Sequence, residues 1–385
     1  MKQLELYLHI PFCAKKCAYC DFLSEPAGRK RQHEYVKALE KEIELFPYNK
    51  EKYHISTVFF GGGTPSLLRS EQIVELMERM KKKFIFEADA EVSIECNPGT
   101  ADERKFLDYR RAGINRISFG LQSAENGELK KLGRIHTWED FLETYRSARN
   151  AGFENINVDL MSALPGQTEA TWAGTLEKVL ELKPEHVSAY SLIIEEGTPF
   201  YDLYQEDDAR RQAGEQPLCL PSEEEERAMY AQTEKMLTEA GMHRYEISNY
   251  AVRGRECRHN IGYWRGTDYV GFGLGASSLL DHVRYRNTSD MDAYLTGDYS
   301  GREREILSKT DQMEEFMFLG LRMMNGVSED EFCFRFGESM NGIYGKTIRK
   351  LEKQGLLKAE GGRVFLTSRG IDVSNTVMAE FLLQV

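Results

Sequence analysis

The stretch that organises the chain is Cys13-Ala14-Lys15-Lys16-Cys17-Ala18-Tyr19-Cys20, three cysteines spaced C-x3-C-x2-C just after an apolar run over residues 4–10. Spacing this short lets three thiolates from one loop converge on one metal centre. An iron–sulfur cube usually has four cysteine ligands, so three leave one iron open to a small molecule. A cluster that reduces a bound cofactor needs this arrangement. The sequence therefore predicts a [4Fe-4S] cluster held by Cys13, Cys17 and Cys20.

Two other interpretations of the cysteine loop are a structural zinc site and three unrelated thiols. Zinc sites built from cysteine usually combine a C-x2-C pair with a second pair further along the chain, and this chain has no such partner. Three unrelated thiols would seldom fall within eight positions when the whole chain has seven cysteines. The cluster interpretation is therefore favoured.

The composition is ordinary for a globular protein, with 41% hydrophobic and 29% charged residues. A length of 385 residues suffices for two or three domains. The longest apolar runs, such as residues 188–194, are too short to span a bilayer, and no signal peptide precedes the first strand. The odd number of cysteines argues against a disulfide framework, so we expect a cytoplasmic protein. The net charge of −12 disfavours a large phosphate-binding surface.

Short apolar runs alternate with helical patterns from residue 4 to about residue 200. The runs are rich in β-branched or aromatic residues and end in Gly, Pro or Asn, as buried parallel strands do. Alternation with helices predicts βαβ units and a parallel sheet, and six units fit an α/β fold of the partial (β/α)6 barrel type. The predicted strands are residues 4–10, 57–62, 91–97, 116–123, 155–164 and 186–193.

The second half of the chain has a different pattern. A polar connector leads to a capping box at Ser222-Glu223-Glu224-Glu225, which predicts the start of a helix. From about residue 306 a helical pattern ends in a hairpin whose turn is Glu360-Gly361-Gly362-Arg363, an order that resembles a winged helix. We predict a barrel over 1–205, a connector region packing on the barrel over 206–300, and a small, mostly helical, winged-helix-like domain over 301–385.

Polar and glycine-rich signatures follow the predicted strands, whose carboxyl ends face the active site in α/β barrels. The glycines of Gly61-Gly62-Gly63-Thr64-Pro65 would let backbone N–H groups approach an anionic or zwitterionic ligand; the alternative is a tight turn. Glu95 ends the third strand, where its carboxylate can accept hydrogen bonds from ribose hydroxyls or an ammonium group; the alternative is a surface glutamate. Asp159 lies inside the fifth strand, where an unpartnered charge is costly, so we expect it to meet a ligand or Arg134.

Tyr7-Leu8-His9-Ile10-Pro11-Phe12, followed by the three cysteines and Asp21-Phe22, resembles the radical S-adenosylmethionine (SAM) superfamily. Within it, the stretch is similar to the branch of oxygen-independent coproporphyrinogen III oxidases and the HemW heme chaperones. The resemblance covers most of residues 4–200 and implies that SAM chelates the open iron. It implies cluster ligation by Cys13, Cys17 and Cys20, and SAM contacts from Tyr7, Tyr19, Gly62, Gly63, Thr64, Glu95, Gln122, Arg134 and Asp159.

Two departures from the oxidase pattern bear on which member of the branch the chain resembles. The oxidases are expected to carry C-x3-C-x2-C-x-C, whereas Phe22 stands at the position of the last cysteine. They are also expected to carry an N-terminal extension that helps to build the substrate site, whereas this chain begins six residues before Tyr7. We therefore expect no coproporphyrinogen III dehydrogenase activity and favour the chaperones.

A second motif, His259-Asn260-Ile261-Gly262-Tyr263-Trp264, favours the chaperones too, because H-N-x-x-Y-W resembles their heme-associated motif. Imidazole is a common axial ligand of heme iron, and Tyr and Trp offer flat faces to a macrocycle. We expect heme to bind at His259 and to pass to client haemoproteins, among them respiratory, membrane-associated ones. Taken alone, such a motif is more often a packed aromatic cluster with a hydrogen-bonded histidine.

The C-terminal domain raises a different class of function. Residues 341–371 hold seven Lys and Arg against two Glu, a net charge of +5, which would suit an iron–sulfur redox sensor that binds DNA. The helical pattern over 341–354 offers few base-reading side chains, and the chain as a whole is acidic. Nucleic acid is therefore not an expected partner; docking of a client protein or covering of the barrel mouth is favoured. We expect a monomer or a weak dimer.

Two further features are interpreted as packing. Gly271-Phe272-Gly273-Leu274-Gly275-Ala276 invites comparison with a nucleotide-binding loop, but no helix with the spacing of a dinucleotide fold follows it. We therefore expect close backbone packing against the barrel. His9 lies inside the first predicted strand, where packing is favoured and a contact with the substrate is the alternative.

Overall fold

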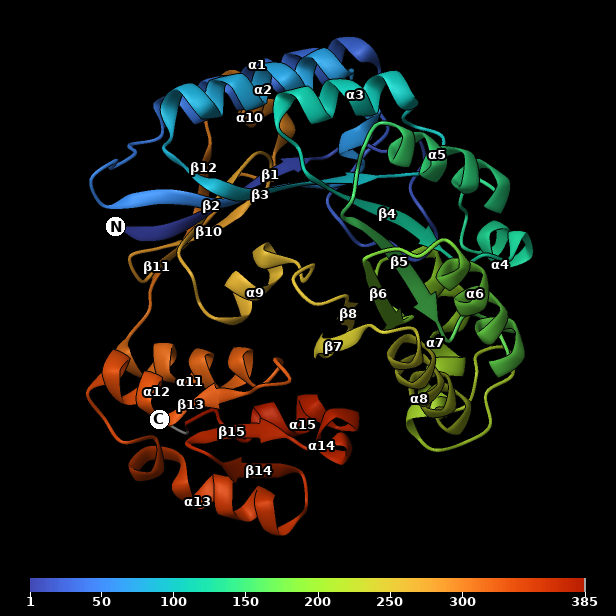
Figure 1. The fold of residues 1–385 in the computed structure, drawn as a ribbon, viewed down its shortest axis with the longest axis vertical. Helices are drawn as coiled ribbons and strands as arrows, with labels where there is room; N and C mark the ends of the chain where they lie inside the picture. The colour runs from blue at the N-terminus through green and yellow to red at the C-terminus, as the bar shows by residue number, and fades with distance from the viewer. Residues whose placement is uncertain (384–385) are drawn as a thin grey trace.

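The main feature of the computed structural model, which describes residues 1–383, is a twelve-stranded sheet. The sheet curves into an open arch (Figure 1). Its strand order is β12-β11-β10-β9-β1-β2-β3-β4-β5-β6-β8-β7. The six central strands pair in parallel and confirm the predicted partial barrel. They are β1 (Lys2–Ile10), β2 (Tyr53–Gly62), β3 (Phe86–Cys96), β4 (Arg116–Gln122), β5 (Ile156–Ser162) and β6 (His186–Ser191).

Helices between these strands cover the convex side of the arch (Figure 1). Side chains alternate between the two faces of a strand, and in β1 the even-numbered residues Leu4, Leu6 and Leu8 are fully buried in the main core. The odd-numbered residues of β1 therefore point to the concave side. The helices are α1 (Arg29–Leu45), α2 (Ser70–Lys83), α3 (Glu103–Ala112), α4 (Asn126–Lys131), α5 (Trp138–Asn150) and α6 (Glu169–Glu181), with the short 3-10 helix η1 (Pro65–Leu67) before α2.

Later segments extend the sheet at both edges. β8 (Asn249–Ala251) pairs with β6 and β7 (His243–Glu246) with β8, both antiparallel. At the other edge β9 (Tyr269–Phe272) runs parallel to β1. An antiparallel series follows: β10 (Ser277–Leu280), β11 (Val283–Asn287) and β12 (Ser300–Ile306). The helices of this part are α7 (Pro199–Gln212), α8 (Glu223–Glu239), α9 (Arg258–Trp264) and α10 (Met291–Thr296).

Two local predictions for this part are confirmed. Ser222 caps α8 through a capping box with Glu225. The glycines at the end of β9 pack closely: a Cβ atom at Gly271 would lie 2.3 Å from the carbonyl oxygen of Ser277, and one at Gly273 would lie 2.6 Å from that of His9. Only glycine fits positions this tight.

The C-terminal domain has its own core and a three-stranded sheet in the order β13-β15-β14, which confirms the winged-helix-like prediction. Gly361 and Gly362 form the hairpin turn with φ angles of 61° and 71°. Some of its basic side chains have partners within the domain, such as Lys350, 2.7 Å from Glu380. Its elements are α11 (Lys309–Gly320), β13 (Val327–Ser328), α12 (Glu329–Phe336), α13 (Met340–Lys353), β14 (Leu357–Glu360), β15 (Arg363–Leu366), α14 (Ser368–Asp372) and α15 (Ser374–Ala379).

Helix α9, which carries the H-N-x-x-Y-W motif, lies on the concave side of the sheet, between the strands and the C-terminal domain (Figure 1). It contacts both β2 and α11. Over residues 1–383, no helix combines the length and the apolar character needed to cross a membrane.

Candidate cofactor site

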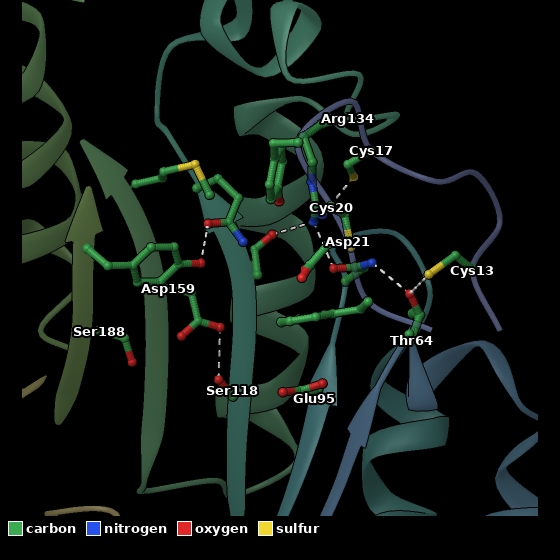
Figure 2. A pocket seen from close by; sticks show the side chains of 18 of the residues that line it. Cys13, Cys17, Cys20, Asp21, Thr64, Glu95, Ser118, Arg134, Asp159 and Ser188 are labelled. Atoms are coloured by element: carbon green, nitrogen blue, oxygen red, sulfur yellow. Dashed lines mark hydrogen bonds between the residues drawn. The ribbon is translucent and has the colours of Figure 1, made fainter. Parts of the chain in front are cut away.

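A cavity of about 460 Å³ opens at the carboxyl ends of the parallel strands, and the loops that follow the strands surround it (Figure 2). It collects every predicted cluster or cofactor residue except Tyr7 and His259. Those that line it are Cys13, Cys17, Tyr19, Cys20, Gly62, Gly63, Thr64, Glu95, Gln122, Arg134 and Asp159. We call it the cofactor cavity.

The cysteine loop is fixed to the rest of the barrel by backbone hydrogen bonds, such as the one from Ala18 N–H to the carbonyl of Leu132 at 3.0 Å. The three cysteines are free thiols that are partly accessible. The Thr64 hydroxyl lies 3.5 Å from the Cys13 sulfur, and an Arg134 N–H lies 3.5 Å from that of Cys17 (Figure 2). Donors of this kind stabilise thiolates, so the loop offers three ligands on one side of the cavity.

The donor set fits a cluster better than a single ion. Within residues 1–383, no group of three or more His, Cys, Asp or Glu side chains is arranged to hold one metal ion. A four-iron cube binds each cysteine through a different iron, so its ligands need not surround one point. Burial raises the pKa of Cys20, and the neighbouring thiols of Cys17 and Cys13 add to this effect. A cationic cluster would offset that repulsion.

The glycine stretch after β2 is needed for close approach of the backbone. Gly62 has a φ angle of 109°, and a Cβ atom there would lie 2.5 Å from the His9 ring. A Cβ atom at Gly63 would lie 2.7 Å from the carbonyl oxygen of Phe12. The Gly62 N–H donates to Glu95 Oε2 at 3.0 Å, so β2 and β3 meet at this point of the cavity wall.

Of the carboxyl groups that line the cofactor cavity, Glu95 and Asp159 lie on the strands. Burial and the nearby Asp159 raise the pKa of Glu95 to about 8, and burial raises the pKa of Asp159 as well. Asp159 accepts hydrogen bonds from the Ser118 hydroxyl at 3.0 Å and from the Asn157 amide at 2.7 Å. Of the two expected partners, a ligand or Arg134, its position in the cavity favours the ligand. Two carboxyls in one partly desolvated cavity favour a ligand that carries positive charge.

Arg134 has other partners, one of which the sequence analysis missed. Its guanidinium donates to the Asn97 side chain at 2.7 Å, and Asn97 donates to the Thr64 hydroxyl at 2.8 Å. Asn97 thus connects the segment after β2 with the segment after α4, and its partners Thr64 and Arg134 each contact a cysteine of the loop. Asn97 directly follows the carboxyl end of β3, and this position could have identified it as a site residue.

Gln122, at the end of β4, has a strained backbone with a φ angle of 75°. The register between β4 and β5 shifts at this point, and the Tyr190 hydroxyl donates to the Gln122 side chain at 2.9 Å. A non-glycine residue with positive φ costs free energy and is frequent at ligand sites. Tyr190 of β6 was also missed, since no local motif marks it.

His259 and Tyr7 are the predicted residues that do not line the cofactor cavity. His259 is 1% exposed; its Nδ1 lies 2.6 Å from the Thr57 hydroxyl and its Nε2 lies 3.0 Å from the Tyr263 hydroxyl. Burial, with a contribution from Arg116, lowers the pKa of His259 to about 3. Neither ring nitrogen is free for an iron in this conformation, so the packed, hydrogen-bonded histidine that was the alternative describes the geometry.

A second cavity of about 430 Å³ contains Tyr7 instead. It lies on the concave side of the sheet over β1 and β9–β11, with α9 and α11 as its other walls. Residues that line it include Tyr7, His9, Tyr263, Trp264, Tyr269 and Arg284. We call it the aromatic cavity. His9 packs against Gly62, as predicted, and it also lines the aromatic cavity; a contact with the substrate stays a prediction.

Helix α9 separates the two cavities. Asn260 lines the cofactor cavity, and Tyr263 and Trp264, one turn later, line the aromatic cavity. The Glu91 carboxylate of β3 accepts hydrogen bonds from the N–H groups of Arg258 and His259 at 3.1 and 3.2 Å, which fixes the start of the helix. The helix is therefore a shared wall attached to the barrel.

Comparison with known proteins places this arrangement in a family. A family model described as the radical SAM superfamily matches residues 7–179, and one described as the HemN C-terminal domain matches residues 307–373. The heme chaperone HemW of Lactococcus lactis is 38% identical over 98% of this chain and 97% of its own length. That of Bacillus subtilis is 36% identical over 98% of both chains. The chain belongs to the HemW family.

The fold agrees with this membership of the HemW family and the radical SAM superfamily. The solved structure of the coproporphyrinogen III oxidase HemN from Escherichia coli has a TM-score of 0.84 and 24% identity, over all of this chain and 91% of the other. At that identity the likeness concerns the fold alone. The HemW relatives match over nearly their full lengths, so the sequence similarity extends beyond the barrel to the C-terminal domain.

Proposed function

We propose that this member of the HemW family is a heme chaperone that binds a [4Fe-4S] cluster, SAM and heme, and passes the heme to haemoproteins in the cytoplasm. The observation that carries the proposal is the similarity, at 36–38% identity over 98% of this chain, to proteins named heme chaperone HemW. The aromatic cavity supports it, because aromatic walls and a nearby Arg suit a macrocycle with carboxylates.

The cofactor cavity supports the cluster and SAM parts of the proposal. Cys13, Cys17 and Cys20 would hold the cluster, which supplies an electron when bound. Glu95 and Asp159 would face the positive charges of SAM, and ionisation of Glu95 would follow because a cation lowers the pKa of a neighbouring carboxyl. Arg134 and Asn97 would hold the wall of the cavity in place through their hydrogen bonds.

The decisive experiment uses the protein with its cluster reconstituted under anaerobic conditions. SAM, dithionite and either heme or coproporphyrinogen III are added, the Soret band is followed, and the products are identified by mass spectrometry. One bound heme per protein molecule in the Soret titration, with no decarboxylated product of coproporphyrinogen III in the mass spectrum, supports the chaperone. Transfer of that heme to an apo-haemoprotein, followed by the change of the Soret band, tests delivery.

The oxidase is the second candidate, and the fold shared with HemN is the observation that favours it. Against it, Phe22 stands where a fourth cysteine is expected, and its side chain is 59% exposed beside the cysteine loop. Conversion of coproporphyrinogen III to protoporphyrinogen IX, with 5′-deoxyadenosine released in step, would overturn the chaperone proposal.

A further inference from the structure

The most exposed large apolar side chain in the described residues 1–383 belongs to helix α12. Phe334 is 90% exposed. Phe332 and Phe336 of the same helix pack instead against Phe316 of α11, with ring centroids 5.5 and 5.7 Å apart. Successive residues of a helix are rotated by about 100°, so Phe334 points away from the core of the C-terminal domain. An aromatic ring exposed to this extent adds little to that core, and exposed aromatic residues are typical anchors of protein interfaces.

The same side of α12 carries negative charge. Asp330 is exposed and lies four residues before Phe334, so the two side chains share one face of the helix. Cys333, also exposed, flanks Phe334. We call Asp330, Cys333 and Phe334 the α12 outer face. It combines an apolar anchor with an acidic side chain, and it therefore suits a partner that offers an apolar pocket bordered by Lys or Arg.

Helix α12 borders the wall of the aromatic cavity. The Arg335 guanidinium donates to the carbonyl of Arg265 at 3.0 Å, and a Cβ atom at Gly266 would lie 3.9 Å from the same guanidinium. Gly266 lines the aromatic cavity, as do Glu315 and Leu319 of α11. Helix α11 contacts both α9 and α12 (Figure 1). A protein bound to the α12 outer face would therefore lie next to segments that form the cavity wall.

We propose that the α12 outer face is the docking site for the acceptor haemoprotein, an apo-protein that presents basic side chains around an apolar pocket beside its empty heme site. The inference rests on the proposed function, in which heme is the cargo. Direct passage of a cargo requires the acceptor to lie against the donor cavity, and α12 meets this requirement. The net charge of −12 also favours a basic acceptor. Heme would pass intact, with its iron in the same oxidation state in both proteins.

The test measures the rate of heme transfer from the full-length protein to apomyoglobin, an acceptor with Lys side chains beside its heme site. Docking makes the rate rise with the apomyoglobin concentration until it saturates, whereas passive release gives a rate that does not depend on concentration. We expect concentration-dependent transfer by the wild type. Phe334→Ser should lower the second-order rate constant at least about tenfold, with the heme affinity and the passive rate unchanged.

Leu218→Ser is the matched control, because Leu218 is 79% exposed and lies in the connector before α8. It should transfer heme at the wild-type rate. Asp330→Lys tests the charge: we expect a rate constant about threefold lower at low salt, with the difference lost at about 1 M salt. Both changes are at exposed positions, so the unfolding temperatures of these variants should equal that of the wild type.

Docking is also measured without heme, through the fluorescence anisotropy of labelled apomyoglobin added to the heme-free protein. Phe334→Ser should weaken this binding, and Leu218→Ser should not. A wild-type transfer rate that does not depend on apomyoglobin concentration, or equal effects of Phe334→Ser and Leu218→Ser, would overturn the inference. A wild type that binds no heme would instead overturn the proposed function, and the anisotropy would still decide whether the α12 outer face docks the acceptor.

Discussion

The cofactor cavity and the aromatic cavity lie on the same concave face of one sheet, yet they are built in different ways. The cofactor cavity takes most of its residues from segments that directly follow parallel strands, beginning with the cysteine loop after β1. The aromatic cavity combines β1 with α9, β9–β11 and α11, which are separated from β1 by more than half of the chain. The first kind of site is encoded in local motifs, and the second arises only through long-range pairing.

The largest effect should come from breaking the cofactor cavity alone. We expect Cys17→Ala to reduce the cluster content of reconstituted protein to near zero, because a cube with two cysteine ligands is not retained. Heme binding in the aromatic cavity should remain. Iron and sulfide analysis and the visible spectrum measure the first effect, and a heme titration measures the second. Cys219→Ala, at an exposed free cysteine, is the matched control.

A substitution in the shared wall should damage both cavities. Gly262→Ala brings a Cβ atom to 1.8 Å from the buried Glu5 side chain, and we expect a loss of about 2 kcal/mol in the free energy of unfolding. Denaturant unfolding measures it. Gly174→Ala, in α6 with nothing within 4 Å of the added atom, should be neutral or stabilising.

A double-mutant cycle with Glu5→Ala checks the origin of that loss. Removal of the Glu5 carboxyl group vacates the space that the added methyl group needs, so Gly262→Ala should cost less in the Glu5→Ala background. An equal cost in both backgrounds would contradict the assigned contact.

A smaller, pH-dependent effect sharpens the description of the cofactor cavity. Between the ordinary pKa of 4.5 and the raised value of about 8, Glu95 keeps its proton in the native state and loses it in the unfolded state. Stability of the cluster-free protein therefore falls as pH rises through this window. Glu95→Gln should remove this loss, so its gain in stability over the wild type should grow as the pH rises from 4.5 to 8, with no such gain below pH 4.5.

Thermal unfolding of both proteins across this pH range measures the difference. Glu177→Gln, at an exposed glutamate on α6, is the control and should show no pH-dependent gain. A gain of equal size at low and high pH would contradict the ionisation argument.

The smallest effect concerns the contact of the C-terminal domain with α9, where Arg322 also lies 3.5 Å from the buried Glu246. The Arg322 guanidinium lies over the Trp264 ring at 4.3 Å and holds the C-terminal domain against α9. Arg322→Lys keeps the charge but loses planar stacking, so we expect a loss of about 0.5–1 kcal/mol in stability and a weaker affinity for heme. Cluster content should not change. Arg110→Lys, which alters a similar contact with Phe153 outside both cavities, should leave heme affinity unaltered.

The difference between the cavities also explains what the sequence could predict. The six parallel strands and most cofactor-cavity residues carry local signals: apolar runs, glycines and polar residues at strand ends. Strands β7–β12 carry weak signals, because most are short and pair with distant segments. His259 was assigned to heme from its motif, because its hydrogen bonds to Thr57 and Tyr263 depend on how α9 packs against the barrel and are not visible in the sequence. The aromatic cavity, which is built from segments far apart in the chain, could be recognised only in the structure.

The parallel pairing of β9 with β1 has a consequence for the way the chain folds. β1 is synthesised long before β9, its partner on one side in the sheet, which begins only at Tyr269. Its edge therefore stays unpaired during most of synthesis, and pairing over so long a loop is slow. An exposed strand edge of this kind promotes association with other chains. We expect the nascent protein to depend on protection of this edge until late in translation.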